Sequence, residues 1–330
     1  LVRIADVFIV IGIAGSIHNG KVSEVGAYMT LLLAANKLND LFYQIFDIFR
    51  TGNKLKKYGG NIHKFFCYQT EKTDGIGASA DKPFEVEFKN VSFSYPNSSF
   101  ALRDISFKIS AGERVAIVGE NGAGKSTIVK LLLRLHDVQS GEILINGVNI
   151  NDYNLFELRN AIGVAFQNTN IYAFSMDENI GLYDNSTEKA IAEAKKAFGL
   201  DLIVAKNGAS NDATLTREFD DNGIVLSGGE AQKVAIARTT TKKFSLLMLD
   251  EPSSALDPIA EYNLNRSLFK RSKETTTIMI AHRLSSVRNM DKILVINNGE
   301  LMESGTHDEL MRVQGLYSEM FLKQAENYQI

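Results

Sequence analysis

The fold is decided by one short stretch, GENGAGKS at Gly119–Ser126. It fits the phosphate-loop pattern G-x-x-x-x-G-K-[ST]. An apolar run, Val115–Val118, precedes it and predicts a buried strand, and a helical pattern begins near Thr127. A strand, a glycine-rich turn and a helix in that order are the context that this pattern requires. We therefore predict a phosphate-binding loop between a strand and a helix.

The chemistry of this loop follows from its residue types. Glycines let backbone N–H groups converge on phosphates, and the helix that follows adds the partial positive charge of its N-terminus. Lys125 is placed to contact the β and γ phosphates, and the Ser126 hydroxyl is placed to ligate Mg²⁺. A chance glycine-rich turn is the alternative, and the flanking strand and helix argue against it. The expected nucleotide contacts in this region are Gly119, Glu120, Asn121, Gly122, Ala123, Gly124, Lys125, Ser126 and Thr127.

Two acidic residues follow a second buried strand. Leu246–Leu249 is a continuous apolar run, and Asp250 and Glu251 come directly after it. Ligands bind at the carboxyl ends of parallel strands, so both acids are expected to face the phosphate loop. Asp250 suits a bound Mg²⁺, and Glu251 is placed to polarise an attacking water as a general base. The pair predicts hydrolysis of a nucleoside triphosphate but does not choose among NTPases.

A second anion-binding helix start lies at Leu226–Glu230, which reads LSGGE. A hydroxyl and two glycines, Ser227, Gly228 and Gly229, open the helical segment Ala231–Arg238. The backbone N–H groups and the dipole at a helix start favour an anion. One chain needs only one cradle for its own triphosphate. We therefore expect the γ-phosphate of a nucleotide held by another molecule to dock here.

Alternating apolar residues on both sides of the phosphate loop predict strands. Phe84–Tyr95 alternates with one register break, and Ile105–Ile109 alternates without one. Asn146-Gly147 is a strong hairpin turn signal. Together the pattern indicates an α/β nucleotide fold with an antiparallel strand layer at its start. Further predicted elements are a helix at Ile128–Leu135 and strands at Thr275–Ala281 and Lys292–Ile296.

The beginning of the chain is more apolar than the rest. Val7–Ile17 is short for a membrane span, whereas Val25–Phe49 exceeds the roughly 20 residues that a span requires. Polar residues between Asn36 and Asp47 interrupt the second stretch, which suits a helix in a bundle or beside a polar cavity. The basic flank Arg50–Lys64 predicts a cytoplasmic side. The alternative is a soluble amphipathic helical hairpin.

Composition sets the remaining limits. The chain of 330 residues is long enough for two domains, and its formal net charge of -3 gives no electrostatic case for a nucleic-acid partner. The single cysteine, Cys67, excludes an internal disulfide framework, and the five histidines show no zinc spacing with it. We predict a helical region at residues 1–70, a polar linker at 71–82 and a nucleotide domain at 83–330.

From about Pro83 onward the chain resembles ATP-binding-cassette (ABC) proteins. The family signature LSGGQ reads LSGGE here, and other landmarks follow in the family's order. Tyr95 in FSYP resembles the aromatic residue that stacks on adenine, and Gln167 in AFQN resembles the loop glutamine that touches Mg²⁺. Asp257 in SALD resembles the loop that joins two ATP sites, and His282 in IAHRLSS resembles the switch histidine at the γ-phosphate.

This resemblance implies an α/β phosphate-loop NTPase fold with a RecA-like core, an antiparallel β layer and an α-helical subdomain. It implies ATP and Mg²⁺ as cofactors, and two copies that close head to tail over two ATP molecules. The implied catalytic residues are Glu251, His282, Lys125 and Gln167, the implied Mg²⁺ ligands are Ser126, Gln167 and Asp250, and further implied nucleotide contacts are Tyr95, Ser227, Gly228, Gly229, Glu230 and Asp257.

The resemblance narrows to exporter-type cassettes at SMDENI, Ser175–Ile180, and at ESGTHDELM near the C-terminus. In exporters the last two membrane helices precede the nucleotide domain, as residues 1–70 would here, so we expect an all-α partial transmembrane region with four further helices before Leu1. The resemblance implies ATP-driven export by a half-transporter, multi-pass in the cell membrane with a cytoplasmic nucleotide domain. Its partner would be a second half, identical or different. The substrate is not specified.

Glu230 departs from the family glutamine, and its charge would oppose the triphosphate of a partner, so we expect a modestly weakened ATP-bound dimer. Thr239-Thr240-Thr241 also departs from the family pattern, and no physical reason for this is evident. Two alternatives remain: a soluble ABC ATPase without a transport role, and a non-catalytic partner subunit. The absence of a second cassette argues against the first, and intact Glu251 and His282 argue against the second.

Overall fold

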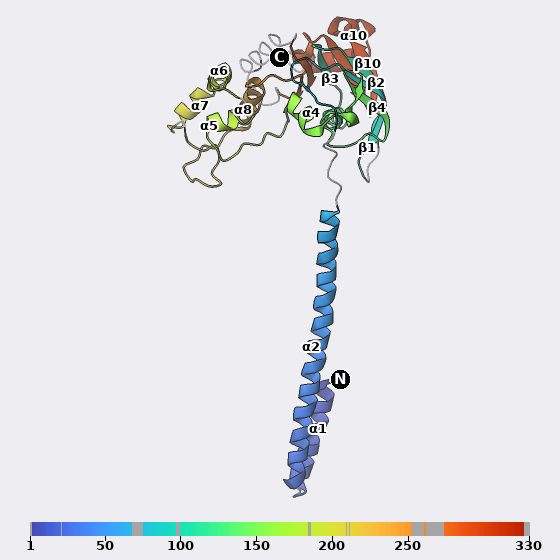
Figure 1. The fold of residues 1–330 in the computed structure, drawn as a ribbon, viewed down its shortest axis with the longest axis vertical. Helices are drawn as coiled ribbons and strands as arrows, with labels where there is room; N and C mark the ends of the chain where they lie inside the picture. Colours follow the sequence, from blue (N-terminus) through green and yellow to red (C-terminus); the bar gives the residue numbers. More distant parts are fainter. Residues whose placement is uncertain are drawn as a thin grey trace. The chain divides into compact units, whose positions relative to one another are not determined.

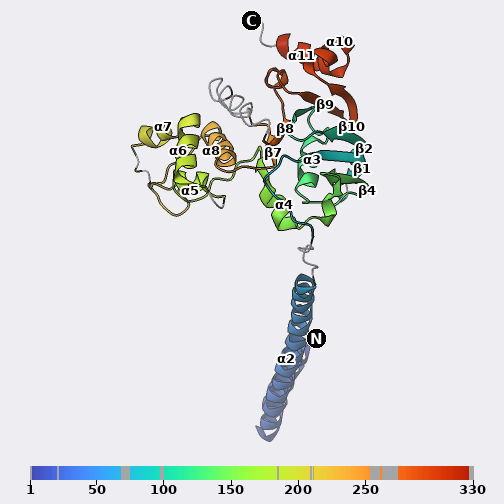
Figure 2. The same ribbon diagram turned by 45° about the horizontal axis from the view of Figure 1, so that its top comes forward.

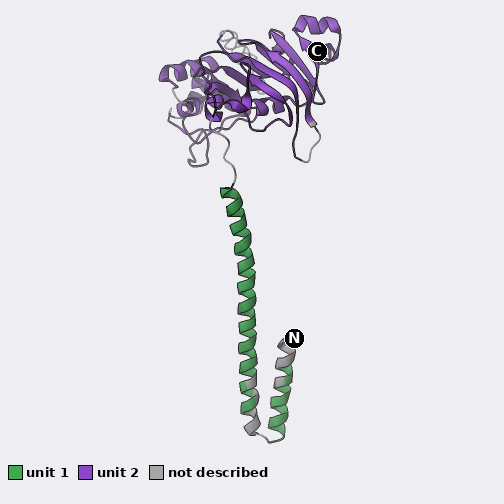
Figure 3. Ribbon diagram, turned by 45° about the vertical axis from the view of Figure 1, so that its right-hand side comes forward, with its two compact units in different colours: residues 1–71 green, residues 72–330 purple. Residues whose placement is uncertain are grey.

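A computed structural model describes residues 2–20, 22–67, 75–96, 100–183, 186–208, 210, 212–252, 261 and 274–326. The chain divides into two compact units, residues 1–71 and 72–330 (Figure 3). The first unit consists of α1 (Val2–His18) and α2 (Val22–Phe66), which pack side by side (Figure 1). Helix α2 is longer than the apolar stretch that predicted it, because it continues through the basic flank.

Both helices of the first unit expose large apolar side chains. Phe8 on α1 and Phe42, Phe46 and Phe49 on α2 are 70%, 68%, 75% and 70% exposed, respectively. Such exposed aromatic groups are unusual on a surface that only water covers. Within the part of the chain that the structure describes, none of the helices combines the length and the apolar character that crossing a membrane demands.

The second unit is built on a mainly parallel sheet with β3 (Arg114–Val118) near its centre. The strand order is β10-β9-β3-β8-β7-β6, and only β10 runs antiparallel to its neighbour. Alternate residues of β3 face two separate cores, with Ile117 on one side and Ala116 and Val118 on the other. The other strands are β6 (Ile162–Ala165), β7 (Leu246–Asp250), β8 (Thr276–Ile280), β9 (Lys292–Asn297) and β10 (Glu300–Gly305).

The predicted antiparallel layer is confirmed as a second sheet with the strand order β2-β1-β4-β5. Its strands are β1 (Val86–Ser94), β2 (Phe100–Ile109), β4 (Ser140–Ile145) and β5 (Val148–Asn149). Asn90, with φ of 49°, lies where the register of β1 shifts. Asn146 and Gly147, with φ of 52° and 80°, form the predicted hairpin turn. Consecutive positive φ angles of this kind match the strand twist.

Residues 75–82, within the predicted linker, belong to the second unit and are hydrogen-bonded to the rest of it. Ser245 donates a hydrogen bond from its Oγ to the backbone oxygen of Ser79 at 3.1 Å, and the backbone N–H of Ala78 donates to Glu157 Oε2 at 3.1 Å.

Helices cover the sheets on both sides. They are α3 (Lys125–Leu132), α4 (Leu155–Ala161), α10 (His307–Val313) and α11 (Leu316–Glu326).

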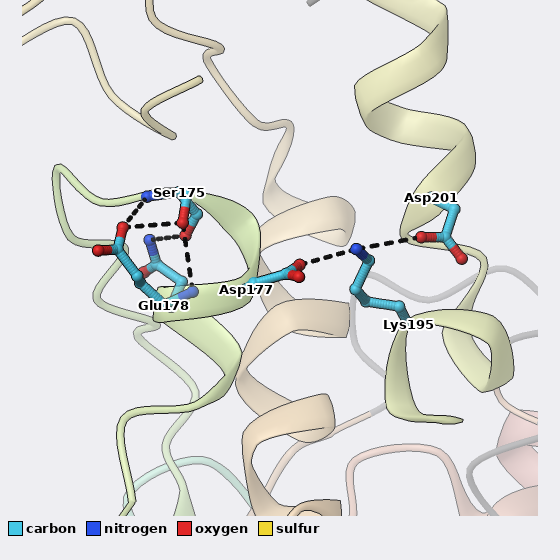
Figure 4. Close-up of polar contacts among 6 residues, drawn as sticks. Ser175, Asp177, Glu178, Lys195 and Asp201 are labelled. Carbon is cyan, nitrogen blue, oxygen red and sulfur yellow. Dashed lines mark hydrogen bonds and ion pairs between the residues drawn. The ribbon is translucent and has the colours of Figure 1, made fainter. Parts of the chain in front are cut away.

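A helical part lies beside the sheets (Figure 2) and comprises α5 (Met176–Ile180), α6 (Glu188–Phe198), α7 (Asp201–Lys206) and α8 (Gly228–Thr240). Helix α5 begins with a capping box in which Ser175 and Glu178 bond to each other's backbone N–H groups (Figure 4). Lys195 on α6 forms ion pairs with Asp177 at 2.7 Å and with Asp201 at 3.4 Å. These contacts join α5, α6 and α7 into one body.

Asn179 ties this helical part to the loop that follows β6. Its side chain is fully buried, and its Oδ1 accepts hydrogen bonds from the Tyr172 N–H at 3.0 Å and from Arg238 Nη2 at 2.9 Å. Its Nδ2 lies 3.0 Å from the backbone oxygen of Tyr172 and from two further backbone oxygens. Arg238, on α8, also donates to the Asn170 oxygen at 2.8 Å, and burial lowers its pKa.

We expect Asn179→Ala to lower the free energy of unfolding by about 3 kcal/mol, because several buried backbone groups would lose their partner at once. Chemical denaturation monitored by circular dichroism measures the change. Asn168→Ala is the matched control, since Asn168 lies exposed on the loop after β6 that the Asn179 side chain binds, and it should change stability by less than about 0.5 kcal/mol. Equal effects of the two variants would refute the role of Asn179.

Candidate active site

The phosphate loop connects the carboxyl end of β3 to the start of α3, as predicted. Gly124 caps α3 with φ of 104°, a left-handed conformation that residues with a Cβ rarely adopt. A Cβ on Gly124 would collide with the backbone oxygen of Ala101, and a Cβ on Gly119 would collide with that of Ile296. The loop is therefore pressed between two neighbouring backbones, and these two positions require glycine.

Lys125 holds its charge inside the loop. Its Nζ donates hydrogen bonds to the backbone oxygens of Gly119 and Glu120, both at 2.8 Å, and the residue is only 6% exposed. Burial lowers the pKa of this ammonium group, and the nearby carboxylates of Glu251 and Asp250 oppose that shift. A cation that is held this way faces the cleft above the loop and favours an anion there.

A cleft of about 580 Å³ opens above the phosphate loop. At one wall the Tyr95 and Thr127 hydroxyls share a hydrogen bond of 3.3 Å, and the Tyr95 ring packs edge-on against Phe93 and His136. Lys130, five residues after the phosphate-loop lysine, places its Nζ 5.3 Å from the centre of the Tyr95 ring. The cleft is lined by Tyr95, Ala101, Asn121, Gly122, Gly124, Lys125, Ser126, Thr127, Lys130, Gln167 and Glu251.

No role was predicted for Lys130 or His136. The available signal for Lys130 was helical spacing, because it lies three residues after Thr127 and shares its helix face. His136 had no signal, because it meets the Tyr95 ring at 5.3 Å only through the fold.

Asp250 ends β7 and Glu251 follows it; Glu251 lines this cleft, and Asp250 lies next to the lining residue Ser126. Asp250 is 7% exposed, and its Oδ1 accepts a hydrogen bond from the Ser126 Oγ at 3.4 Å. Burial raises the pKa of Asp250, and the Ser126 bond partly offsets that rise. Glu251 accepts a hydrogen bond at its Oε2 from Gln167 Nε2 at 2.8 Å. The fold thus brings Ser126 and Gln167, which are distant in the sequence, to the adjacent acids Asp250 and Glu251.

The donor set at this edge suits one kind of metal. Among the described residues, no three His, Cys, Asp or Glu side chains converge to hold an ion. Ser126 and Asp250 nevertheless offer two oxygens on one side of the cleft. Mg²⁺ commonly binds through one or two protein oxygens and takes its other ligands from water and phosphates. The residues therefore fit an Mg²⁺ ion that is bound together with a nucleotide.

The backbone of Glu251 is fixed as well as its side chain. Its N–H donates to the backbone oxygen of Ile280 at 3.0 Å, and its own backbone oxygen accepts from Gln232 Nε2 at 2.7 Å. Its φ of 51° is in the left-handed region. Gln232 was not predicted, and its only sequence signal was its place on the helix that follows LSGGE.

Two of the predicted regions are absent from the lining of this cleft. Ser227–Glu230 lie at the start of α8 in the helical part (Figure 2) and are not among the cleft residues. His282 follows the carboxyl end of β8 and is exposed, and it is also absent from the cleft lining. The predicted contact Asp257 lies outside the described residues. The cleft therefore contains only part of the predicted site, without Ser227–Glu230 and His282.

The start of α8 has its own internal hydrogen bonds. Glu230 Oε2 accepts from both the N–H and the hydroxyl of Ser227 at 2.8 Å, and the Glu230 N–H lies 3.4 Å from Ser227 Oγ. This is a capping box, and the bonds from Ser227 lower the pKa of Glu230, so that its carboxylate stays ionised. The glutamate at this position therefore satisfies the helix start but places a negative charge there.

A phosphate loop at the centre of a parallel sheet, joined to an antiparallel layer and a helical part, defines the nucleotide-binding domain of an ABC ATPase. Residues 102–254 match the family described as ABC transporter. The second unit therefore carries an ABC transporter domain, and the chain is similar to ABC exporters.

The chain is similar to the ATP-dependent lipid A-core flippase of Haemophilus influenzae, with 40% identity over 76% of this chain and 43% of that protein. It is also similar to the subtilin transport ATP-binding protein SpaT of Bacillus subtilis, with 36% identity over 99% of this chain and 53% of that protein. A solved bacterial Atm1-family ABC exporter with ATP bound matches 93% of this chain and 53% of its own, at 34% identity and a TM-score of 0.75. The chain spans about half the length of these relatives.

We expect Gly124→Ala to weaken nucleotide binding at least tenfold, because the added methyl group meets the Ala101 backbone and distorts the loop. Titration with a fluorescent ATP analogue measures the affinity. Gly122→Ala is the matched control, since Gly122 also has a positive φ, of 80°, but has open space where a Cβ would lie. Gly122→Ala should weaken nucleotide binding by no more than the conformational strain of the left-handed φ, about 1 kcal/mol. Equal affinities of the two variants would contradict this account of the loop.

Proposed function

We propose that this chain is the C-terminal part of an ABC exporter half-transporter, and that it hydrolyses ATP to drive export across a membrane. The observation that carries the proposal is the separation of two phosphate-binding features within one chain. The phosphate loop opens into the cleft, whereas the LSGGE helix start lies in the helical part, outside that cleft. Two copies arranged head to tail would complete two ATP sites.

ATP would bind along the cleft. The Tyr95 ring is at the wall where adenine would stack, and the backbone N–H groups of Gly119–Thr127 would surround the phosphates. Lys125, which is held within the loop, would contact the β and γ phosphates. Ser126, Asp250 and Gln167 would hold Mg²⁺, which supplies positive charge to the phosphate oxygens when bound.

Hydrolysis would be directed by Glu251. Its carboxylate would accept a proton from water as the water oxygen attacks the γ-phosphorus, and the bond to the ADP oxygen would break. Gln167 orients this carboxylate through the 2.8 Å hydrogen bond. Lys125 would stabilise the charge that develops on the phosphate, and His282 would contribute from beyond β8 once the second copy has closed.

The second copy would cover the nucleotide. Its Ser227, Gly228 and Gly229 would present a hydroxyl and helix N–H groups to the γ-phosphate. Asp257 is proposed to lie on the loop between the two sites. The partner is a second half-transporter, identical or different, because the motif set of this chain is intact and would serve in either arrangement.

The first unit would belong to the membrane domain of a multi-pass protein of the cell membrane. The exposed aromatic side chains of α1 and α2 favour lipid or further helices as neighbours. The basic residues between Arg50 and Lys64 favour a cytoplasmic side for the adjoining nucleotide domain. We propose domain boundaries at residues 1–70, 71–82 and 83–330. The substrate stays unassigned.

We expect Glu251→Gln to lower ATP turnover by roughly 10²- to 10⁴-fold, the usual contribution of a general base. Binding of ATP should persist, because the amide keeps the size and the Gln167 contact. Phosphate release under saturating ATP measures turnover, and equilibrium binding of a fluorescent analogue provides the control. Wild-type turnover in the variant would remove Glu251 from this role, and a wild-type chain without ATPase activity would favour a non-catalytic partner subunit.

We expect Glu230→Gln to tighten ATP-driven dimerisation roughly threefold to fivefold, because it removes a carboxylate from the surface that covers the partner's triphosphate. Sedimentation of the variant in a Glu251→Gln background, which retains ATP, measures the dimer. The gain should shrink at high salt. Glu178→Gln is the matched control, because Glu178 makes the same capping box at the start of α5. No difference between the two variants would contradict the effect of the Glu230 charge.

A further inference from the structure

Glu251 is held in a backbone conformation that it would not adopt without support. A φ of 51° in a residue with a side chain is strained, because the Cβ crowds the backbone in this left-handed region. Three elements supply contacts to this residue: Ile280 at the end of β8, Gln167 after β6 and Gln232 on α8. Such strain persists where the surroundings over-determine it. The general base candidate is therefore positioned from three directions.

The contact from Gln232 comes from α8, the helix that begins at the LSGGE segment. Gln232 lies about one and a half turns after Ser227, a distance of about 7.5 Å along the helix axis. Its side chain is 5% exposed, and its Nε2 donates to the Glu251 backbone oxygen at 2.7 Å. Helix α8 therefore carries two features within its first turns. Its start offers a hydroxyl and N–H groups to an anion, and Gln232 donates a hydrogen bond to the backbone of Glu251, the proposed general base.

We propose that Gln232 is a positioning residue through which one ATP site of the dimer controls the other. This inference rests on the proposed function, because it requires the γ-phosphate of the second copy to dock at Ser227. In the dimer, the start of α8 belongs to the site whose nucleotide the second copy holds. Glu251 belongs to the site whose nucleotide this chain holds. Gln232 joins the two within a single short piece of helix.

The physical basis is the stiffness of a helix compared with a loop. When a phosphate draws the start of α8 toward it, Gln232 moves with the same helical turns and carries its amide along. The Glu251 backbone oxygen follows this donor, and the peptide group after Glu251 rotates. Gln167 holds the carboxylate at 2.8 Å, so the rotation changes the direction in which Glu251 presents its other oxygen to water. Alignment of the base then depends on occupancy of the second site.

A purely structural role for Gln232 predicts a different outcome. A buried amide that only fills space and satisfies a carbonyl would affect stability, and any loss of turnover would follow the loss of folded protein. A positioning role lowers turnover in protein that is fully folded and binds ATP normally. It also removes the dependence of one site on the other. The two roles therefore separate in the kinetics.

The first experiment compares Gln232→Met with wild type in the full chain, measuring steady-state phosphate release and the binding of a fluorescent ATP analogue. We expect turnover to fall about tenfold with unchanged ATP affinity, and the ATP dependence to lose its sigmoid shape. Thr239→Val is the matched control, because it removes another buried polar group from α8, one that bonds to the Ile236 oxygen within the helix. Wild-type turnover and cooperativity in Gln232→Met would overturn the proposal.

The second experiment uses mixed dimers with two affinity tags. One subunit carries Glu251→Gln, so only the site of the other subunit hydrolyses ATP. In the proposed dimer, Ser227 of the hydrolysing subunit covers the nucleotide held by the Glu251→Gln subunit. Adding Ser227→Ala to the hydrolysing subunit therefore alters only the site that cannot hydrolyse ATP. We expect it to lower turnover at least threefold, and to have no effect when the hydrolysing subunit also carries Gln232→Met. An unchanged effect of Ser227→Ala in the Gln232→Met background would overturn the proposal.

The controls separate this inference from the proposed function. Absence of ATPase activity or of ATP-driven dimers in the wild-type chain would refute the proposed function itself. Thermal unfolding of each variant verifies that it is folded. Should Gln232→Met fail to fold, Gln232→Asn takes its place in the same cycle, because it withdraws the amide from Glu251 by one methylene group and stays polar.

Discussion

The parallel pairing of β3, β8 and β7 is the constraint on which the rest of the site depends. Ile117 lies opposite Ile280, and Ile280 lies opposite Asp250, so the three strands end in one row. Neighbouring strands are about 4.8 Å apart, which places the end of β7 roughly 10 Å from the end of β3. That gap is narrow enough for Ser126, on the helix after the phosphate loop, to reach Asp250.

The same edge explains why the loop is tight. Gly119 and Gly124 pass against the backbones of Ile296 and Ala101, which come from the neighbouring strand β9 and from the antiparallel layer. The two sheets therefore shape the phosphate loop from opposite sides. The Lys125 side chain is buried in the phosphate loop. Two backbone oxygens of the loop hold its ammonium group, so the position of the charge is set by the loop backbone.

Helix α8 connects the helical part with the edge of the sheet at Glu251. Near its C-terminal end, Arg238 binds the Asn179 side chain and the Asn170 backbone oxygen, and near its start Gln232 binds Glu251. Both contacts run from a side chain of α8 to groups outside the helix. The helix that offers an anion site at its first residues is thus fastened to the sheet edge and to the loop after Gln167. The helical part therefore contacts Glu251 directly through Gln232, although its described residues are absent from the cleft lining.

The sequence by itself determined the phosphate loop, the acid pair after β7, the capped start of α8 and most of the strands. These are local patterns, in which glycine spacing and period-two alternation report the conformation of consecutive residues. The short strand β6 and the polar edge strand β10 were not predicted, because neither shows a clear alternation. Only the tertiary structure decided that Gln167 meets Glu251 across 84 positions and that Gln232 meets it across 19. Single hydrogen bonds between distant residues leave no periodic trace in a sequence, since they depend on which strands become neighbours in the sheet.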